Sequence, residues 1–129
     1  MKKFDEFTLA LANLKEIYKY EEPYDTVVFA GIVALYGHCY ELAWETMQEV
    51  LEYNGVSDIK TSSPRVVLRT ASKRGLIRDE ELWQSALQAR NNTTYLNDEA
   101  VMLDVARSAK LFYWQMFCDL KNEIERNWL

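Results

Sequence analysis

The chain has 129 residues, of which 49% are hydrophobic and 27% are charged, and its formal net charge at pH 7 is −5. This length suits a single domain, residues 1–129, that is large enough to bury a hydrophobic core. The acidic total excludes a protein that coats nucleic acid without specificity. The charge is nevertheless uneven, because residues 60–78 contain six basic side chains and no acidic one.

The first predicted helix spans about Phe4 to Tyr20. Its apolar side chains recur at intervals of three and four residues, the pattern of a helix that contributes one seam to a bundle. They are Phe4, Phe7, Leu11, Leu14 and Tyr18. We expect the helix to end before Pro23, because the residue that precedes a proline avoids the α region.

The second predicted helix, Thr26 to Tyr53, is the one against which the others are expected to pack. It has no charged residue from Thr26 to Tyr40, and its apolar residues fall on every face. We therefore expect it to be buried nearly all round, with His38 in the core. The uncharged run is shorter than the roughly 20 residues that cross a bilayer, and Glu41 follows it, so we expect no membrane contact. Gly55 is expected to form a left-handed cap at its end.

The third predicted helix begins at Ser63 and Pro64, because serine caps free backbone amides and proline suits the first turn, and it stops at Gly75. Three cations four residues apart share one face and a fourth follows them: Arg65, Arg69, Lys73 and Arg74. Such a face can bind nucleotide phosphates, RNA or an acidic partner. The alternative is a solvated helix face.

The fourth predicted helix starts at Asp79, where Glu80 and Glu81 add negative charge that the helix dipole favours, and polar residues 91–94 weaken its end. A fifth helix runs from Asn97 to about Arg126. Its expected inward stripe is Val101, Val105, Ala109, Phe112, Met116, Leu120 and Ile124. Five helices without an alternating strand pattern predict an all-α protein, an antiparallel four- to five-helix bundle.

Histidine and cysteine are scarce. With one histidine, His38, and two cysteines, Cys39 and Cys118, the chain lacks the ligand set of a zinc site, and we expect neither a metal nor a cofactor. Both cysteines lie in apolar helical patterns and are expected to be free thiols in a reducing compartment. Charged residues rather than an apolar run follow Met1, so no signal peptide is expected and the predicted location is the cytoplasm.

Three patches of sequence together resemble a known family. They are Tyr40–Trp44, then Ser63 to Arg69 with Ala71 and Gly75–Ile77, and finally Trp83 with Arg90–Thr94 and Asp98–Glu99. In this order and spacing they resemble the nucleotidyltransferase substrate-binding protein family, a branch of the HEPN superfamily of helical bundles. The similarity spans about residues 4 to 125, and the middle patch is its most specific part.

The resemblance implies an HEPN-like bundle that forms homodimers and binds a minimal nucleotidyltransferase encoded nearby, as one half of a toxin–antitoxin-type pair. This chain would be the non-catalytic, substrate-binding partner, with a nucleotide or RNA as ligand. The candidate residues for binding nucleotide, nucleic acid or the partner are Arg65, Arg69, Lys73, Arg74, Arg90 and Asn91.

The ribonuclease pattern of the superfamily is incomplete in this chain. Active HEPN ribonucleases are known for an arginine and a polar residue, followed by a histidine a few positions later and by a tyrosine that accepts adenylate. Arg90 and Asn91 match the start, but Tyr95 stands at the histidine position and Asn97 at the tyrosine position. An unperturbed tyrosine, with a pKa of about 10, does not suit proton transfer near neutral pH. The alternative function is a weak or altered endoribonuclease toxin that uses Arg90, Asn91 and Tyr95.

Glu41 is an acidic residue at the end of an otherwise apolar stretch. An unpaired buried carboxylate would be too costly, so Glu41 is either partly exposed at an edge of the bundle or buried with a partner. Arg90 is the candidate partner across the bundle. We expect a structural ion pair rather than a catalytic acid.

Overall fold

The computed structural model describes residues 1–129 and contains helices and no strands. α1 (Lys2–Leu14) continues as a 3-10 segment (Lys15–Lys19), and a loop leads to the long α2 (Thr26–Tyr53). A short 3-10 turn (Ile59–Thr61) precedes α3 (Pro64–Lys73) and α4 (Glu80–Asn92). α5 (Glu99–Ser108), a π-helical turn (Ala109–Tyr113) and α6 (Trp114–Asn127) then form one continuous rod.

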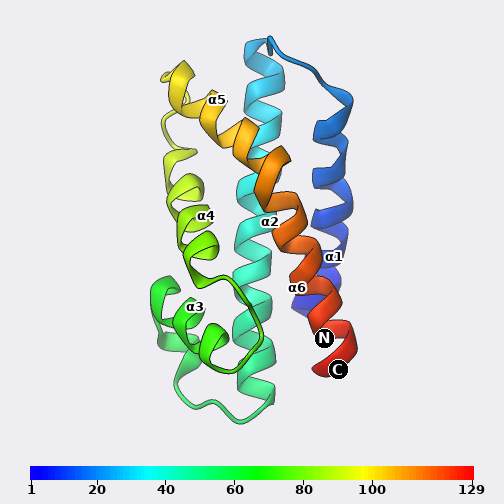
Figure 1. The fold of residues 1–129 in the computed structure, drawn as a ribbon, viewed down its shortest axis with the longest axis vertical. Helices are drawn as coiled ribbons and strands as arrows, with labels where there is room; N and C mark the ends of the chain where they lie inside the picture. The colour runs from blue at the N-terminus through cyan, green and yellow to red at the C-terminus, as the bar shows by residue number, and fades with distance from the viewer.

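Figure 1 shows how these helices surround α2. α1 packs along α2, and the rod of α5 and α6 crosses α2 at a tilt. The short α3 lies beside the C-terminal end of α2, with α4 next to it, and the two chain termini lie close together. The predicted all-α helical bundle is confirmed.

The helices begin where the sequence places capping side chains. Each N-terminal cap accepts a hydrogen bond from the backbone N–H three residues later, which satisfies one of the free amides of the first turn. The capping residues of α2, α3, α4 and α5 are Asp25, Ser63, Asp79 and Asp98. Just past α2 and α3 stand Gly55 and Gly75, with φ of 91° and 80°, a region in which only glycine meets no steric penalty.

The core is centred on the ring of Tyr36, which is fully buried in α2. Its hydroxyl donates to the Ala86 carbonyl of α4 at 2.5 Å. Its ring stacks on Tyr113 with centroids 5.4 Å apart and lies 6.0 Å from Phe117 of α6. Phe117 also meets Phe7 of α1 edge to face at 6.1 Å. These contacts join α1, α4, α6 and the π-helical turn around one point on α2.

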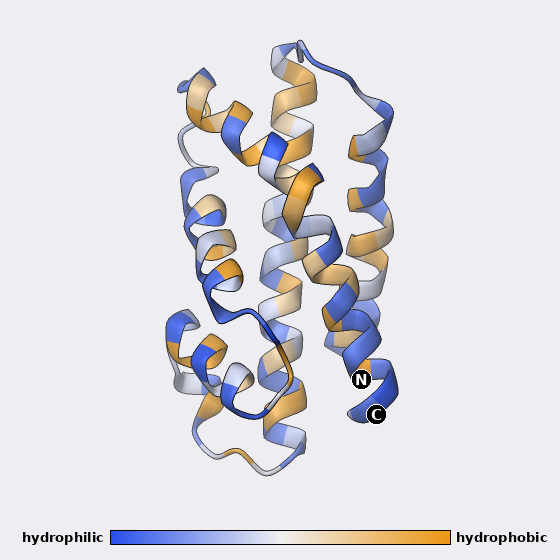
Figure 2. Cartoon of the chain, in the orientation of Figure 1, coloured by the Kyte–Doolittle hydropathy of each residue, from blue (hydrophilic) through white to orange (hydrophobic).

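The prediction that α2 is buried nearly all round was wrong. One face of the helix is exposed, and we refer to it as the α2 stripe: Val27, Ala30, Gly31, Ala34, His38 and Glu41. Figure 2 shows that the N-terminal half of α2 is largely apolar, and the residues of the stripe are nevertheless exposed. An uncharged sequence therefore did not require burial here, and His38 is an exposed residue rather than the expected core histidine.

By length and composition alone, α2 is apolar enough to cross a membrane. The core helix of a soluble bundle passes the same test, and α2 packs against α1, α3, α4 and α5.

Two local changes of helix type shift the predicted register. The π turn at 109–113 holds more residues than an α turn, so Tyr113 takes the buried position expected for Phe112, which is 53% exposed. The 3-10 segment after α1 winds more tightly, so Ile17 is buried in place of Tyr18. Tyr18 instead donates a hydrogen bond to the Lys110 carbonyl at 2.7 Å. Both inward assignments, Phe112 and Tyr18, were therefore wrong.

Candidate functional site

A small cavity opens where α2, α3 and α4 meet. Its volume is about 190 Å³, and three of its seven lining residues are hydrophobic. The lining consists of Tyr40, Glu41, Trp44, Pro64, Leu87, Arg90 and Asn91. Pro64 is the first residue of α3, so the Ser63 cap sets the position of this wall, and Asn91 lies at the C-terminal end of α4.

Glu41 and Arg90 form an ion pair at the rim of the cavity. The Arg90 Nη2 atom donates to the Glu41 Oε2 atom at 3.1 Å. The side chains are 50% and 39% exposed, so water screens much of their attraction, and a pair of this kind contributes at most about 1 kcal/mol. The ion pair predicted across the bundle is present. Glu41 is partly exposed at the edge of the bundle and is not buried.

Tyr40 also lines this cavity, and its hydroxyl is buried in the protein. The residue is only 2% exposed, and no protein group lies within hydrogen-bond distance of its Oη atom. Its ring is held by Trp83 and Phe117, with centroids 6.0 and 6.4 Å away. Burial raises the pKa of the Tyr40 phenol well above its ordinary value, and the positive charges of Arg90 and Arg65 oppose this only in part. The phenol is therefore a neutral O–H donor near neutral pH.

Trp44 adds a second buried donor to the wall. Its Nε1–H also lacks an acceptor, and it lies between this cavity and a more polar one that includes Glu45 and Glu49. Neither donor has an acceptor within the protein. Sequence reasoning placed Tyr40 and Trp44 in the family-like patch but not at a binding site, because burial without a partner has no signature in one sequence.

The basic residues of 60–78 separate into three groups. Lys60 pairs with Glu52 at 3.2 Å, and Arg78 belongs to a different cavity. The other four are exposed on α3 or at its end and have no carboxylate within 4.0 Å; we call them the α3 basic face: Arg65, Arg69, Lys73 and Arg74. Of these, Arg65 is the one nearest the site, beside Pro64, and its Nη1 atom donates to Gln84 at 3.2 Å.

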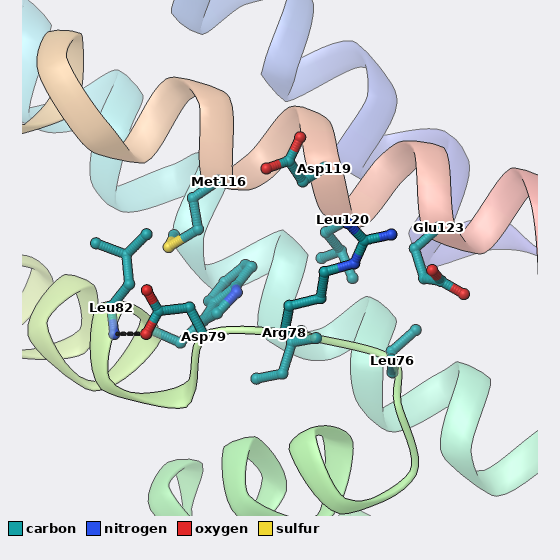
Figure 3. A pocket seen from close by; sticks show the side chains of 10 residues that line it. Leu76, Arg78, Asp79, Leu82, Met116, Asp119, Leu120 and Glu123 are labelled. Carbon is teal, nitrogen blue, oxygen red and sulfur yellow. Dashed lines mark hydrogen bonds between the residues drawn. The ribbon is translucent and has the colours of Figure 1, made fainter.

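Figure 3 shows where Arg78 lies. It extends from the loop between α3 and α4 over α6, with its guanidinium between Asp119 and Glu123. The cavity there has a volume of only about 70 Å³. Because these acidic side chains face Arg78, its charge is directed toward α6 rather than added to the α3 basic face.

The candidate ribonuclease residues are only partly together. Arg90 and Asn91 line the cavity, whereas Tyr95 is 60% exposed on the loop after α4 and is not among the lining residues. His38 lies one helical turn before Glu41 on the α2 stripe. The end of α4 passes close to this part of α2, since a Cβ placed on Gly37 would stand 3.8 Å from the Thr93 Oγ1 atom.

Solved structures share this fold. A Haemophilus influenzae protein, whose structure is described as revealing the fold of a substrate-binding domain of a nucleotidyltransferase, is 18% identical with a TM-score of 0.82. The alignment covers 95% of this chain and 99% of that one. A protein from Thermus thermophilus is 25% identical with a TM-score of 0.82, and the alignment covers 93% of this chain and 99% of that one. A comparison with curated proteins gives no match.

The sequence itself matches a family profile along nearly its whole length. The profile is that of the nucleotidyltransferase substrate-binding-protein-like family, and it matches residues 2–126. This span includes all residues of the cavity and every helix of the bundle except the last residue of α6. The chain therefore belongs to the nucleotidyltransferase substrate-binding-protein-like family.

Proposed function

We propose that this chain is the non-catalytic, substrate-binding subunit of a two-component system with a minimal nucleotidyltransferase, the HEPN half of a toxin–antitoxin-type pair. The observation that carries the proposal is the family match over residues 2–126. The cavity between α2, α3 and α4 supports it, because a concave site with convergent polar groups is where a small ligand binds. The α3 basic face supports a second role, since four unpaired cations fit an acidic partner surface.

The proposed working form is a cytoplasmic homodimer. The α2 stripe supports self-association, because it is an apolar face that no helix of the same chain covers. The stripe ends at Glu41, beside Arg90 and the cavity. A second copy seated on the stripe would therefore lie next to the ligand site.

The partner proposal is tested by co-expressing the tagged chain with the short nucleotidyltransferase encoded beside it. The two proteins are expected to elute together in gel filtration. A double variant, Arg69→Glu with Lys73→Glu, is expected to weaken the complex, with the effect largest at low salt. Lys2→Glu with Arg126→Glu is the matched control, because both residues are exposed and lack an ion pair. Separate elution of the unmodified proteins would disprove the partner proposal.

Weak or altered endoribonuclease activity is the second candidate function. The position of His38 favours it, because this exposed imidazole lies one turn from the carboxylate that pairs with Arg90. An imidazole titrates near neutral pH and suits the proton transfers of RNA cleavage. Neither Tyr95 nor His38 lines the cavity, but His38 lies on α2 one turn from Glu41, whereas Tyr95 lies on the loop after α4.

This second function is tested with total RNA and tRNA. The unmodified protein is incubated beside His38→Ala and Arg90→Ala, all prepared identically. Cleavage by the unmodified protein that both variants lose would establish the activity. Intact RNA in all three incubations would exclude it, and so would cleavage that all three share, since that pattern indicates a contaminant.

A further inference from the structure

We propose that protonation of His38 controls the assembly of the homodimer: two copies pair through the α2 stripe near neutral pH and separate in mild acid. The inference rests on the homodimer given above as the working form, and it names how that contact is regulated. The observation that carries it is one exposed, titratable side chain in a face that has no other ionisable group from Val27 up to Glu41.

The α2 stripe is self-complementary in the size of its side chains. It extends over roughly 21 Å of helix from Val27 to Glu41, with Ala34 at its centre. A two-fold axis that covers the whole stripe passes Ala34 and sets each residue against the one equally far on the other side of the axis. The imidazole of one copy then faces Ala30 of the second copy, a small residue beside Gly31. The bulkiest side chain in the middle of the stripe therefore meets the smallest ones.

An apolar groove continues the stripe toward the 3-10 segment after α1. Its volume is about 220 Å³, and six of its eight lining residues are hydrophobic, among them Tyr20 and Leu35. Val27 and Gly31 belong to both the groove and the stripe. The imidazole placed against Ala30 and Gly31 of the second copy lies at the edge of this groove. The contact therefore transfers His38 from water into apolar surroundings.

The charged groups on the helices around His38 are engaged elsewhere. Glu41, one turn along α2, pairs with Arg90 of α4 at 3.1 Å. Lys3 of α1 pairs with Glu45 and Glu6, at 2.8 and 3.6 Å. Glu16, the one charged residue of the groove, pairs with Lys19 at 2.7 Å. The remaining carboxylate of α1, Asp5, is exposed to solvent. An imidazolium in the contact would therefore be a buried charge without a partner, which is far more costly than a buried neutral ring.

The sign of the pH dependence follows from this difference. The dimer accepts only the neutral imidazole, whereas the monomer accepts both forms, so each copy takes up one proton when an acidic solution separates the pair. An exposed imidazole titrates near pH 6.5. With two protons for each dimer, the dissociation constant is expected to rise about 100-fold between about pH 8 and about pH 5.5.

Sedimentation equilibrium of the full chain over this pH range tests the inference, and the whole range lies above the isoelectric point of about 4.9. His38→Gln is polar but cannot titrate, so its dissociation constant is expected to stay nearly constant. His38→Arg carries a permanent charge and is expected to be as weak a dimer at the highest pH as the unmodified chain is in acid. Both substitutions lie at an exposed position, and circular dichroism checks that the fold is retained.

Three results would overturn the inference: a dissociation constant of the unmodified chain that does not change with pH, a tighter dimer in acid, or the same pH dependence in His38→Gln. The homodimer proposal fails in a different way. An unmodified chain that is monomeric at every pH would remove the homodimer together with its regulation, whereas a dimer indifferent to pH would remove only the role of His38.

Discussion

At the cavity rim, Glu41 and Arg90 form an ion pair that is open to solvent. The two groups are 3.1 Å apart and roughly half exposed, so their attraction is screened and the side chains can separate at little cost. This makes the pair a weak structural support. A neutral substitution at Glu41 measures how much it contributes.

Glu41→Gln tests the strength of this pair. The free energy of unfolding is expected to change by less than about 1 kcal/mol, because no charge is left buried. Urea unfolding measures this change. A loss of about 3 kcal/mol or more would show that the pair behaves as a buried one.

Among single residues, the cysteines were predicted correctly and the histidine was not. Cys39 and Cys118 are both free thiols, and Cys39 is fully buried. His38 carries no signal that tells a buried face of α2 from an exposed one, because apolar residues surround it on all sides of the helix. His38 is exposed because the neighbouring helices pack against the other faces of α2. This depends on tertiary packing, which the sequence of one helix does not reveal.

At the scale of elements, helix boundaries were largely predictable and helix register was not. Asp25, Ser63 and Gly75 carry local chemistry that starts or stops a helix wherever it lies in the fold. The π turn at 109–113 has no such marker. It changes which side of the rod faces α2, so the regular helical period wrongly predicted that Phe112 is buried.

The shifted register is tested by comparing two phenylalanines of the same rod. Phe117→Ala removes a fully buried ring that contacts Phe7 and Tyr36, and it is expected to cost about 3–5 kcal/mol. Phe112→Ser is expected to change the free energy of unfolding by no more than about 0.5 kcal/mol, because Phe112 is 53% exposed. Urea unfolding measures both changes in free energy, provided that the slope of the free energy against urea concentration is the same in the variants and the unmodified chain. A larger cost at Phe112 would place that ring in the core and contradict the π turn.

The loop before α2 is attached to α5 by one arginine. Arg107 donates to Glu22 through two atoms, at 2.9 and 2.6 Å. These hydrogen bonds lower the pKa of the Glu22 carboxyl below its ordinary value of 4.5. A carboxyl with a lowered folded pKa contributes stability that is complete above its unfolded pKa and is lost as the pH falls through the folded pKa.

Arg107→Gln should therefore destabilise the protein near neutral pH and lose this effect in acid. Urea midpoints of the variant and the unmodified chain are compared at about pH 7 and about pH 3. The difference is expected to shrink at the lower pH, and at pH 7 it is expected to shrink with added salt because the pair is exposed. Arg126→Gln, which removes an unpaired arginine, should show no such dependence. A difference that grows in acid would contradict the assigned pair.

At the scale of the whole molecule, the candidate site combines predictable and unpredictable parts. Glu41, Arg90 and the α3 cations were identifiable because a charge in an apolar run and a basic island in an acidic chain stand out in the sequence. The convergence of Tyr40 with Arg65 and Arg90 was not, since it depends on how α3 and α4 meet α2. The same packing leaves the α2 stripe uncovered, and this apolar face is the proposed contact between two copies of the chain.

If the α2 stripe is the homodimer contact, one large charge at its centre should separate the protomers. Ala34→Arg places that charge among Ala30, Gly31 and His38, on an exposed face where the monomer can accommodate it. Ala12→Arg is the matched control, because Ala12 is an exposed alanine of α1 outside the stripe. Light scattering coupled to gel filtration is expected to give twice 15.2 kDa for the unmodified chain and for Ala12→Arg, and 15.2 kDa for Ala34→Arg. The free energy of unfolding, measured with urea, should stay nearly unchanged in Ala34→Arg, because an exposed alanine contributes little to the core. A dimer that survives Ala34→Arg would place the interface on another face, and a monomeric unmodified chain would leave the stripe free for the nucleotidyltransferase instead.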